Sequence, residues 1–260
     1  MHVSPDPDLV TYWLADEIDE RGYGLRDDTW HVVDALEAAG RPAWFRLGDR
    51  DLAMCLIRTE ELRGGRSLTE AHGAVVDAMG VAARVLPMAD EPVATRVLHG
   101  GRLLPFQEYM IVHAAAPPVE GVEIDGVERA RPTDAVLAAL ADAELIVIGP
   151  SNPVISIGPI LALPGMREAL RGAPAPVMAV SPFVDGRSVK GPTEGFCAWA
   201  GIETSAGGIA RAYAEVIDGI AADEAVEGLP HLVLDTLMDS TERMRQVARK
   251  ILEFGRSLGA

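Results

Sequence analysis

The second half of the chain alternates short apolar runs with longer amphipathic stretches. The run at 145–149, Leu-Ile-Val-Ile-Gly, has the length of a strand and no polar side chain. A strand buried on both faces of a parallel sheet has this pattern, and similar runs occur at 177–180 and 232–234. Apolar residues recur at helical spacing between and after these runs, at 134–143, 159–163, 165–171, 205–220 and 241–258. Strands that alternate with helices predict a parallel sheet with helices on both faces.

The first half of the chain has a different pattern. Apolar residues at helical spacing predict helices at 10–18, 29–39, 52–62 and 68–79. Gly100-Gly101 separates two further runs, 93–99 and 102–112, and predicts a β-hairpin. The stretch 117–131 has no regular period, so we expect it to cross the surface.

These elements predict one α/β domain over residues 1–260. Within it, a helical and β-hairpin insertion at 13–129 precedes a Rossmann-like half at 130–260. The expected architecture is a Rossmann-like three-layer sandwich with a parallel sheet. A doubly wound sheet needs about five strands, whereas the second half offers three strong ones, so part of the usual sheet is missing from this pattern.

Composition excludes several classes of protein. The 260 residues carry 23 Lys+Arg against 39 Asp+Glu, a formal charge of −16, which disfavours nucleic acid and anionic membrane as partners. No apolar run approaches the roughly 20 residues of a membrane span, and no signal sequence begins the chain, so we expect a cytoplasmic protein. Two cysteines, Cys55 and Cys197, cannot form a disulfide framework. An anionic substrate would need local help from a divalent cation, a helix N-terminus or a few basic side chains.

Two carboxylates lie close together near the N-terminus. Asp6 and Asp8 stand in Ser-Pro-Asp-Pro-Asp, where two prolines stiffen the backbone. One interpretation is a loop that binds Mg²⁺, a hard cation that prefers carboxylate oxygen. The other is a helix N-cap formed by Asp8.

The turn Gly-Pro-Ser-Asn-Pro at 149–153 follows the strongest predicted strand. Open α/β sheets bind their ligands at the carboxyl ends of strands. We expect free backbone N–H groups and the Ser151 and Asn152 side chains to face a phosphate there, with Ser156 continuing the surface. The alternative is an ordinary strand-to-helix turn. No Gly-x-Gly-x-x-Gly dinucleotide fingerprint occurs in the chain.

Charged residues before two predicted helices allow two interpretations. Asp27, Asp28 or Thr29 can cap the helix at 29–39, and Asp49 or Asp51 the helix at 52–62. Capping leaves Arg26 unexplained. Lys190, in a loop after the strand at 177–180, can neutralise a diphosphate or be an ordinary exposed lysine.

Taken in order, nine segments of the chain resemble the CofD-like family of 2-phospho-L-lactate (or phosphoenolpyruvate) transferases of deazaflavin coenzyme F-420 biosynthesis. The matching segments lie at 4–8, 24–30, 48–53, 86–88, 106–109, 149–153, 181–183, 190–192 and 235–238. No single segment is specific, but together they cover nearly the whole chain.

This resemblance implies a Mg²⁺-dependent enzyme with two small-molecule partners. Family members move a phosphoenolpyruvyl or 2-phospholactyl group from a guanosine-diphosphate conjugate to 7,8-didemethyl-8-hydroxy-5-deazariboflavin and release GMP. Asp6 would hold the metal and orient the attacking hydroxyl, with support from Asp8. The other implied contacts are with substrate (Arg26, Asp49, Arg50, Met88 and Lys190) and with the nucleotide (Gly149, Ser151, Asn152 and Ser156).

The chain departs from the family at its start. Family members begin with a strand, a Gly-Gly-rich turn and a second strand. Such a unit takes at least about 30 residues in total, and this sequence starts after it. We therefore expect Met1 not to be the natural start, or the chain to be a degenerate member. Two alternatives to the active enzyme are a non-catalytic nucleotide- or nucleotide-sugar-binding regulatory protein and an inactive truncated member. Without the missing strands the sheet would have an exposed edge, which also allows pairing with a partner, such as a second copy in a homodimer.

Overall fold

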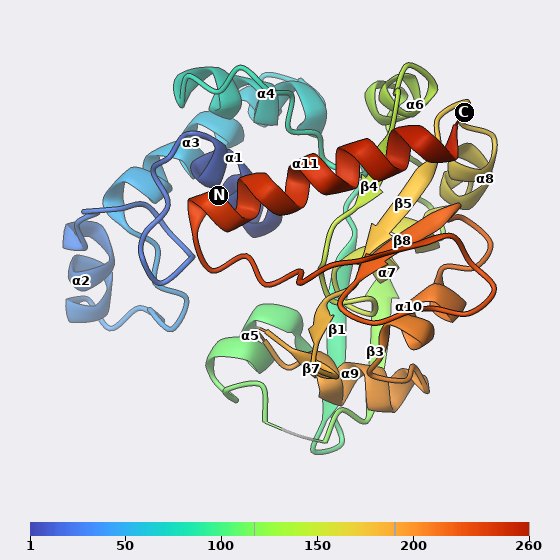
Figure 1. Ribbon diagram of the computed structural model, residues 1–260. Coiled ribbons are helices and arrows are strands. Elements are labelled where there is room, and N and C mark those ends of the chain that lie inside the picture. Colours follow the sequence, from blue (N-terminus) through green and yellow to red (C-terminus); the bar gives the residue numbers. More distant parts are fainter. Residues whose placement is uncertain (117, 190, 260) are drawn as a thin grey trace.

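The computed structural model describes residues 1–116, 118–189 and 191–259 (Figure 1). Within these residues, parallel strands form one sheet in the order β4 (Ile146–Ile148), β5 (Val177–Val180), β8 (Gly219–Ala222) and β9 (His231–Val233). Every residue of β5 and β8 is buried, which is typical of central strands covered on both faces. The predicted parallel sheet is confirmed.

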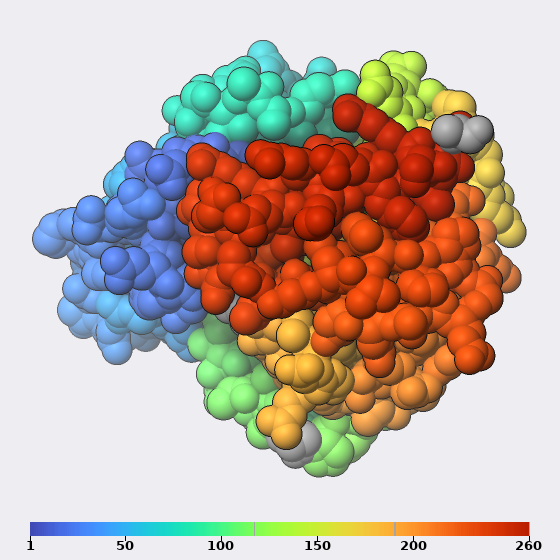
Figure 2. All heavy atoms as spheres, viewed as in Figure 1, coloured from blue at the N-terminus to red at the C-terminus, as the bar shows by residue number. Residues whose placement is uncertain are grey.

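One face of this sheet is covered by a single long helix. Helix α11 (Thr241–Leu258) lies in front of the strands in Figure 1, and its atoms, coloured red, form part of the front surface in Figure 2. Its residues Val247 and Ile251 are buried against Met178 and Val180 of β5. Gly255 permits this close approach, because a Cβ there would lie 2.5 Å from a Leu145 methyl group.

The opposite face carries the larger core and several short helices. Leu161, Met166, Leu170 and Ile209 are buried in this core. They come from α7 (Ile157–Ala162), α8 (Met166–Arg171) and α10 (Ala206–Ala212), and α6 (Asp134–Ala141) packs its Val136 and Leu140 onto the same core. The Thr133 side chain caps α6 by accepting a hydrogen bond from the Val136 N–H. Helices on both faces complete the three layers of the predicted sandwich.

The prediction of one helix over 205–220 is wrong. Helix α10 ends at Ala212, and the end of this stretch belongs to strand β8. The run that contains β8 is short and apolar, and periodicity alone cannot separate such a strand from a buried helical segment.

The first half of the chain is helical, as predicted. Its helices are α1 (Pro5–Leu14), α2 (His31–Ala38), α3 (Asp49–Arg63) and α4 (Leu68–Ala78). The stiffened loop expected around Asp6 and Asp8 is wrong, because α1 already begins at Pro5. Proline fits the first position of a helix, where its fixed φ is helical and its missing N–H costs nothing.

An antiparallel sheet follows the helices, in the order β2 (Arg102–Pro105), β1 (Ala94–His99), β3 (Gly121–Asp125). The predicted hairpin is confirmed, and Gly100 and Gly101 both take the positive φ that its turn requires. Two details differ from prediction: the second strand gives way to α5 (Phe106–Ile111), and the supposed surface crossing contains β3.

The remaining elements lie between β5 and α10. Strands β6 (Phe183–Val184) and β7 (Arg187–Ser188) form a small hairpin before α9 (Thr193–Ala200). The boundary drawn at 129/130 between the two halves stays a prediction. No helix within the described residues is both long and apolar enough to cross a membrane.

Candidate functional site

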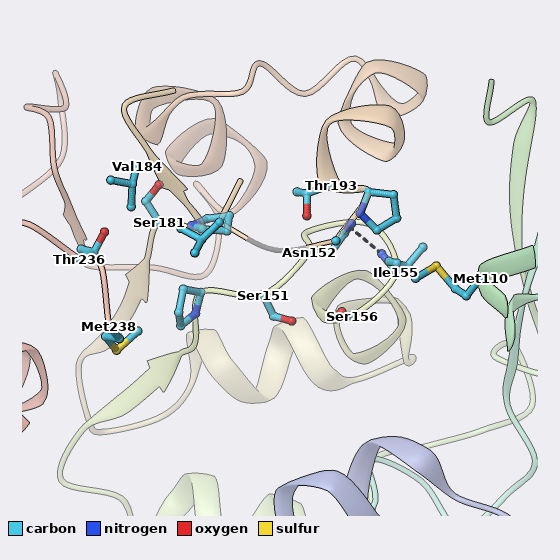
Figure 3. Close-up of a pocket in the computed structure, with 15 residues that line it drawn as sticks. Met110, Ser151, Asn152, Ile155, Ser156, Ser181, Val184, Thr193, Thr236 and Met238 are labelled. Atoms are coloured by element: carbon cyan, nitrogen blue, oxygen red, sulfur yellow. Dashed lines mark hydrogen bonds between the residues drawn. The ribbon is translucent and has the colours of Figure 1, made fainter. Parts of the chain in front are cut away.

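A cavity of about 430 Å³ lies where the parallel strands end (Figure 3). Ser151 and Asn152 follow β4, Ser181 follows β5, and Thr236 and Met238 follow β9. Other walls come from α5 and from the start of α9. The carboxyl edge of a parallel sheet is the usual ligand position in open α/β folds, and this volume suits a small molecule.

Asn152 organises the turn that follows β4. Its Oδ1 accepts hydrogen bonds from the backbone N–H groups of Val154 at 2.9 Å and Ile155 at 3.2 Å. These two bonds fix the orientation of the amide, since only the oxygen can accept. Asn152 is 8% exposed, and its Nδ2 has no hydrogen-bond partner among the described residues. A buried donor without a partner is costly, so this group is a candidate ligand contact.

The expectation of free backbone N–H groups along this turn is wrong at most positions. The N–H of Ser151 bonds the Gly149 carbonyl, and those of Ser156 and Ile157 bond the Asn152 carbonyl. The N–H groups of Val154 and Ile155 are already bound by the Asn152 side chain. The backbone N–H groups of this turn find acceptors within the turn, because the Asn152 side chain forms an Asx turn and supplies one of them.

Three of the four predicted nucleotide contacts line the cavity, namely Ser151, Asn152 and Ser156. Gly149 immediately precedes this wall and is not among the lining residues. Sequence reasoning missed Thr236, which is 4% exposed and whose Oγ1 has no hydrogen-bond partner within residues 1–116, 118–189 and 191–259. The signal was available, because Thr236 follows the run at 232–234 just as Ser151 follows the run at 145–149.

Asp8 lies in the interior of the helical half. Its carboxylate accepts hydrogen bonds from both terminal nitrogens of Arg58, one of them at 3.0 Å, and Arg58 is fully buried. Burial raises the pKa of Asp8 to about 7, against the opposing effect of the Arg58 charge. The interpretation of Asp8 as an N-cap is wrong, because Ser4 precedes the helix and Asp8 points to α3.

The buried acidic cluster around Asp8 does not suit Mg²⁺. Among the described residues, ligand atoms of Asp8, Asp51 and Cys55 lie within 4.8 Å of one another. Asp8 is held by Arg58, and Asp51 accepts a hydrogen bond from the Tyr12 hydroxyl at 2.8 Å. Burial raises the pKa of the Cys55 thiol to about 12, and a thiol is a poor ligand for this hard cation.

Asp6 has a different environment from Asp8. It is exposed in the first turn of α1, although desolvation by the surrounding protein raises its pKa. Mg²⁺ is commonly held by one or two carboxylates together with substrate phosphates. A single exposed carboxylate is compatible with that arrangement, so Asp6 is the better metal candidate of the two.

The structure brings Arg26 and Arg50 together at the surface of the helical half. An Nη of Arg50 donates to the Arg26 carbonyl at 3.0 Å, and Arg50 also pairs with Glu17 at 3.1 Å. Asp49 is occupied structurally, since it accepts from the backbone N–H groups of His31 and Val32 at the start of α2.

The other two predicted substrate contacts are not in the described cavity wall. Met88 is half-buried and packs against the core beneath the parallel sheet. Lys190 lies outside the described residues, so the prediction for it stays a prediction.

The fold and this cavity define a class: an α/β protein whose parallel sheet carries a ligand-sized cavity at its carboxyl edge. An X-ray crystal structure of a protein from Bacillus halodurans shares the fold, with a TM-score of 0.59 over 95% of this chain and 83% of that one at 14% identity.

The sequence comparisons specify the family. Residues 1–249 match the family described as 2-phospho-L-lactate transferase CofD, and the chain belongs to it. The 2-phospho-L-lactate transferase of Methanosarcina mazei is 38% identical, over 96% of this chain and 86% of that protein. The phosphoenolpyruvate transferase of Kitasatospora aureofaciens is also 38% identical, over 97% of this chain and 84% of that protein. The expected resemblance is confirmed.

Proposed function

We propose that this protein transfers a phosphoenolpyruvyl or 2-phospholactyl group from a guanosine-diphosphate conjugate to 7,8-didemethyl-8-hydroxy-5-deazariboflavin. The ribityl hydroxyl oxygen bonds to the phosphorus that carries the transferred group. The bridging P–O bond breaks, GMP leaves with that oxygen, and the hydroxyl proton is released. Attack at phosphorus needs no covalent enzyme intermediate.

Family membership is the observation that carries this proposal. Relatives at the same identity bear names for both donors, 2-phospho-L-lactate transferase and phosphoenolpyruvate transferase. The sequence therefore supports the transfer chemistry and leaves the donor to experiment. The cavity at the sheet edge supports it further, because it offers a place for one of the substrates.

The helical half supplies the polar groups that we assign to the acceptor. In the proposal, Asp6 binds Mg²⁺ and orients the attacking hydroxyl. Mg²⁺, when bound, supplies positive charge that offsets the diphosphate. Arg26 and Arg50, which lie together at the surface, contact substrate. Asp8 acts indirectly, because its ion pair with Arg58 holds α1, and therefore Asp6, against α3.

The test is a transfer assay with each donor, the deazaflavin and Mg²⁺. We expect GMP and the coupled deazaflavin to form in equal amounts with at least one donor. Asp6→Asn should lower the rate by about a hundredfold or more. Asp77→Asn changes another exposed carboxyl, on α4, and should leave the rate unchanged. Absence of GMP with both donors would reject the reaction, and normal turnover by Asp6→Asn would reject the role of that carboxyl.

A further inference from the structure

The cavity at the sheet edge is uncharged in the part of the chain that the structure describes. Its wall combines apolar side chains, among them Met110, Ile155, Val184 and Met238, with serine, threonine and asparagine. A diphosphate is normally held by basic side chains, a cation or a set of free backbone N–H groups. The described wall, which does not include residue 190, carries no basic side chain, and its large apolar share suits a ring system better than a phosphate.

The turn after β4 gives the same indication independently. Five successive or nearly successive N–H groups there, from Ser151 to Ile157, already bond to Gly149 or Asn152. Such a turn cannot wrap a phosphate with its backbone unless those bonds break. What it presents to the cavity is the Asn152 side chain.

The Asn152 amide is a directional donor. Its Oδ1 is occupied by two backbone N–H groups, and its Nδ2 is buried without a partner in the part of the chain that the structure describes. Figure 3 shows Asn152 on one side of the cavity and Thr236 on the opposite side. Thr236 Oγ1 is also buried, and none of the described residues forms a hydrogen bond with it. A ligand that satisfied both would be largely apolar, with hydrogen-bonding atoms at its edges.

We infer that this cavity holds the uncharged heterocycle of a substrate and that Asn152 Nδ2 donates a hydrogen bond to a ring carbonyl oxygen. The hydroxyl of Thr236 contacts a second polar atom of the same ring system. The inference rests on the proposed function, whose two substrates both carry such a carbonyl: the guanine of the donor and the pyrimidinedione ring of the deazaflavin. A ring with an amino group in place of the carbonyl would bind less well, because this amino group and Asn152 Nδ2 are both hydrogen-bond donors.

Asn152→Asp tests the proposed hydrogen bond from Nδ2 to the ring carbonyl, because it replaces this donor nitrogen by an acceptor oxygen. The retained oxygen still accepts from Val154 and Ile155, while the second oxygen accepts instead of donating. GDP and ADP both carry the diphosphate, so the new charge weakens both, and the ratio of their dissociation constants reports the ring contact. Gln246→Glu adds the same charge on α11, away from the cavity wall, as the matched control.

If guanine occupies the cavity, the wild-type protein should bind GDP at least about tenfold more tightly than ADP, and Asn152→Asp should reduce that ratio by about tenfold or more. If the deazaflavin occupies it, the GDP-to-ADP ratio should stay constant, while the affinity for the deazaflavin falls by a similar factor. Thr236→Val, which keeps the side-chain shape, should weaken the same ligand as Asn152→Asp. Gln246→Glu should change neither ratio nor affinity.

A different pattern would overturn the inference and leave the transferase intact. This is the case if GDP, ADP and inorganic pyrophosphate weaken equally in Asn152→Asp while the deazaflavin is unaffected, because the cavity would then bind phosphate. Unchanged binding of every ligand in both variants, with melting temperatures near the wild type, would overturn it as well. Absence of GDP and deazaflavin binding by the wild-type protein would instead reject the proposed function.

Discussion

Asp28, just before α2, caps the N-terminus of α3, and Asp49, the first residue of α3, caps the N-terminus of α2. The Asp28 carboxylate accepts from the backbone N–H groups of Arg50 at 2.9 Å and Asp51 at 3.1 Å, at the start of α3. The Asp49 carboxylate, in the first turn of α3, accepts from two backbone N–H groups at the start of α2. This exchange ties the two helix N-termini together.

Gly48 makes the approach of Asp28 sterically feasible. Its φ of −69° is ordinary, but a Cβ at Gly48 would lie 2.1 Å from Asp28 Oδ2. We therefore expect Gly48→Ala to displace the carboxylate and lower the free energy of unfolding by about 1–2 kcal/mol, the range for a lost N-cap.

A double-mutant cycle separates this clash from other effects of the methyl group. In the Asp28→Gly background both the carboxylate and the Asp28 Cβ, which the new methyl group would otherwise approach to 2.9 Å, are gone, so Gly48→Ala should cost much less than it does alone. The measurement is urea unfolding of the four proteins. Additive costs would show that the methyl group acts through something other than Asp28.

Arg58 neutralises a charge that lies inside the helical half. Arg58→Met removes both hydrogen bonds to Asp8 and should destabilise the protein by about 3–5 kcal/mol, because a buried carboxyl loses its partner. Asp8→Asn combined with Arg58→Met leaves no buried charge at this position and should recover part of the loss. Denaturant unfolding of both variants checks this, and an equally unstable double variant would show that packing, not charge, decides.

The regular elements were largely predictable from the sequence, and the exceptions have physical reasons. The run at 177–180 is apolar because both faces of β5 are covered, and its apolar pattern alone indicates this. The run at 145–149 has the same pattern, but Val147 of β4, at the edge of the sheet, is 43% exposed, so the expectation that this strand is buried on both faces is wrong. The run that contains β8 is equally apolar but joins a helical stretch without a polar break, so its conformation depends on its neighbours in the sheet.

The site was predictable where it follows strand ends and not where it depends on long-range pairing. Asn152 was predicted to contact a ligand because it follows the carboxyl end of a parallel strand. The same argument, applied to the run at 232–234, would have predicted Thr236. Sequence proximity assigned Asp28 and Asp49 each to its adjacent helix, whereas the structure exchanges them across about 20 positions. The partner of Asp8, Arg58, lies 50 positions away, and no local pattern indicates it.

His72 should make stability depend on pH. It lies on α4 and is fully buried, with a hydrogen bond of 3.2 Å to Thr11 of α1, and burial together with the Arg58 charge lowers its pKa to about 4. Between about pH 4 and 6.5 the folded protein thus binds fewer protons here than the unfolded chain. This contribution to stability is complete above about pH 6.5 and is lost as the pH falls toward 4.

The raised pKa values of Asp8 and Asp51 act in the opposite direction. The test is therefore the difference between wild type and His72→Gln, measured by urea unfolding from pH 4.5 to 7.5. That difference should grow in favour of the wild type as the pH rises. His231→Gln changes an exposed imidazole and is the control. A difference independent of pH would contradict this role of His72.

The contact of α11 with the sheet depends on the absence of a side chain at Gly255. A methyl group there would lie 2.5 Å from a Leu145 methyl and 3.1 Å from the Met178 sulfur, inside the cluster that α11 forms with β5. Gly255→Ala should therefore lower the free energy of unfolding by about 1–3 kcal/mol through overpacking, despite the better helix propensity of alanine. Leu145→Ala in the same chain opens the space that the new methyl needs, so the double variant should cost less than the sum of the two single changes. Additivity in urea unfolding would mean that α11 does not rest on the sheet at this point.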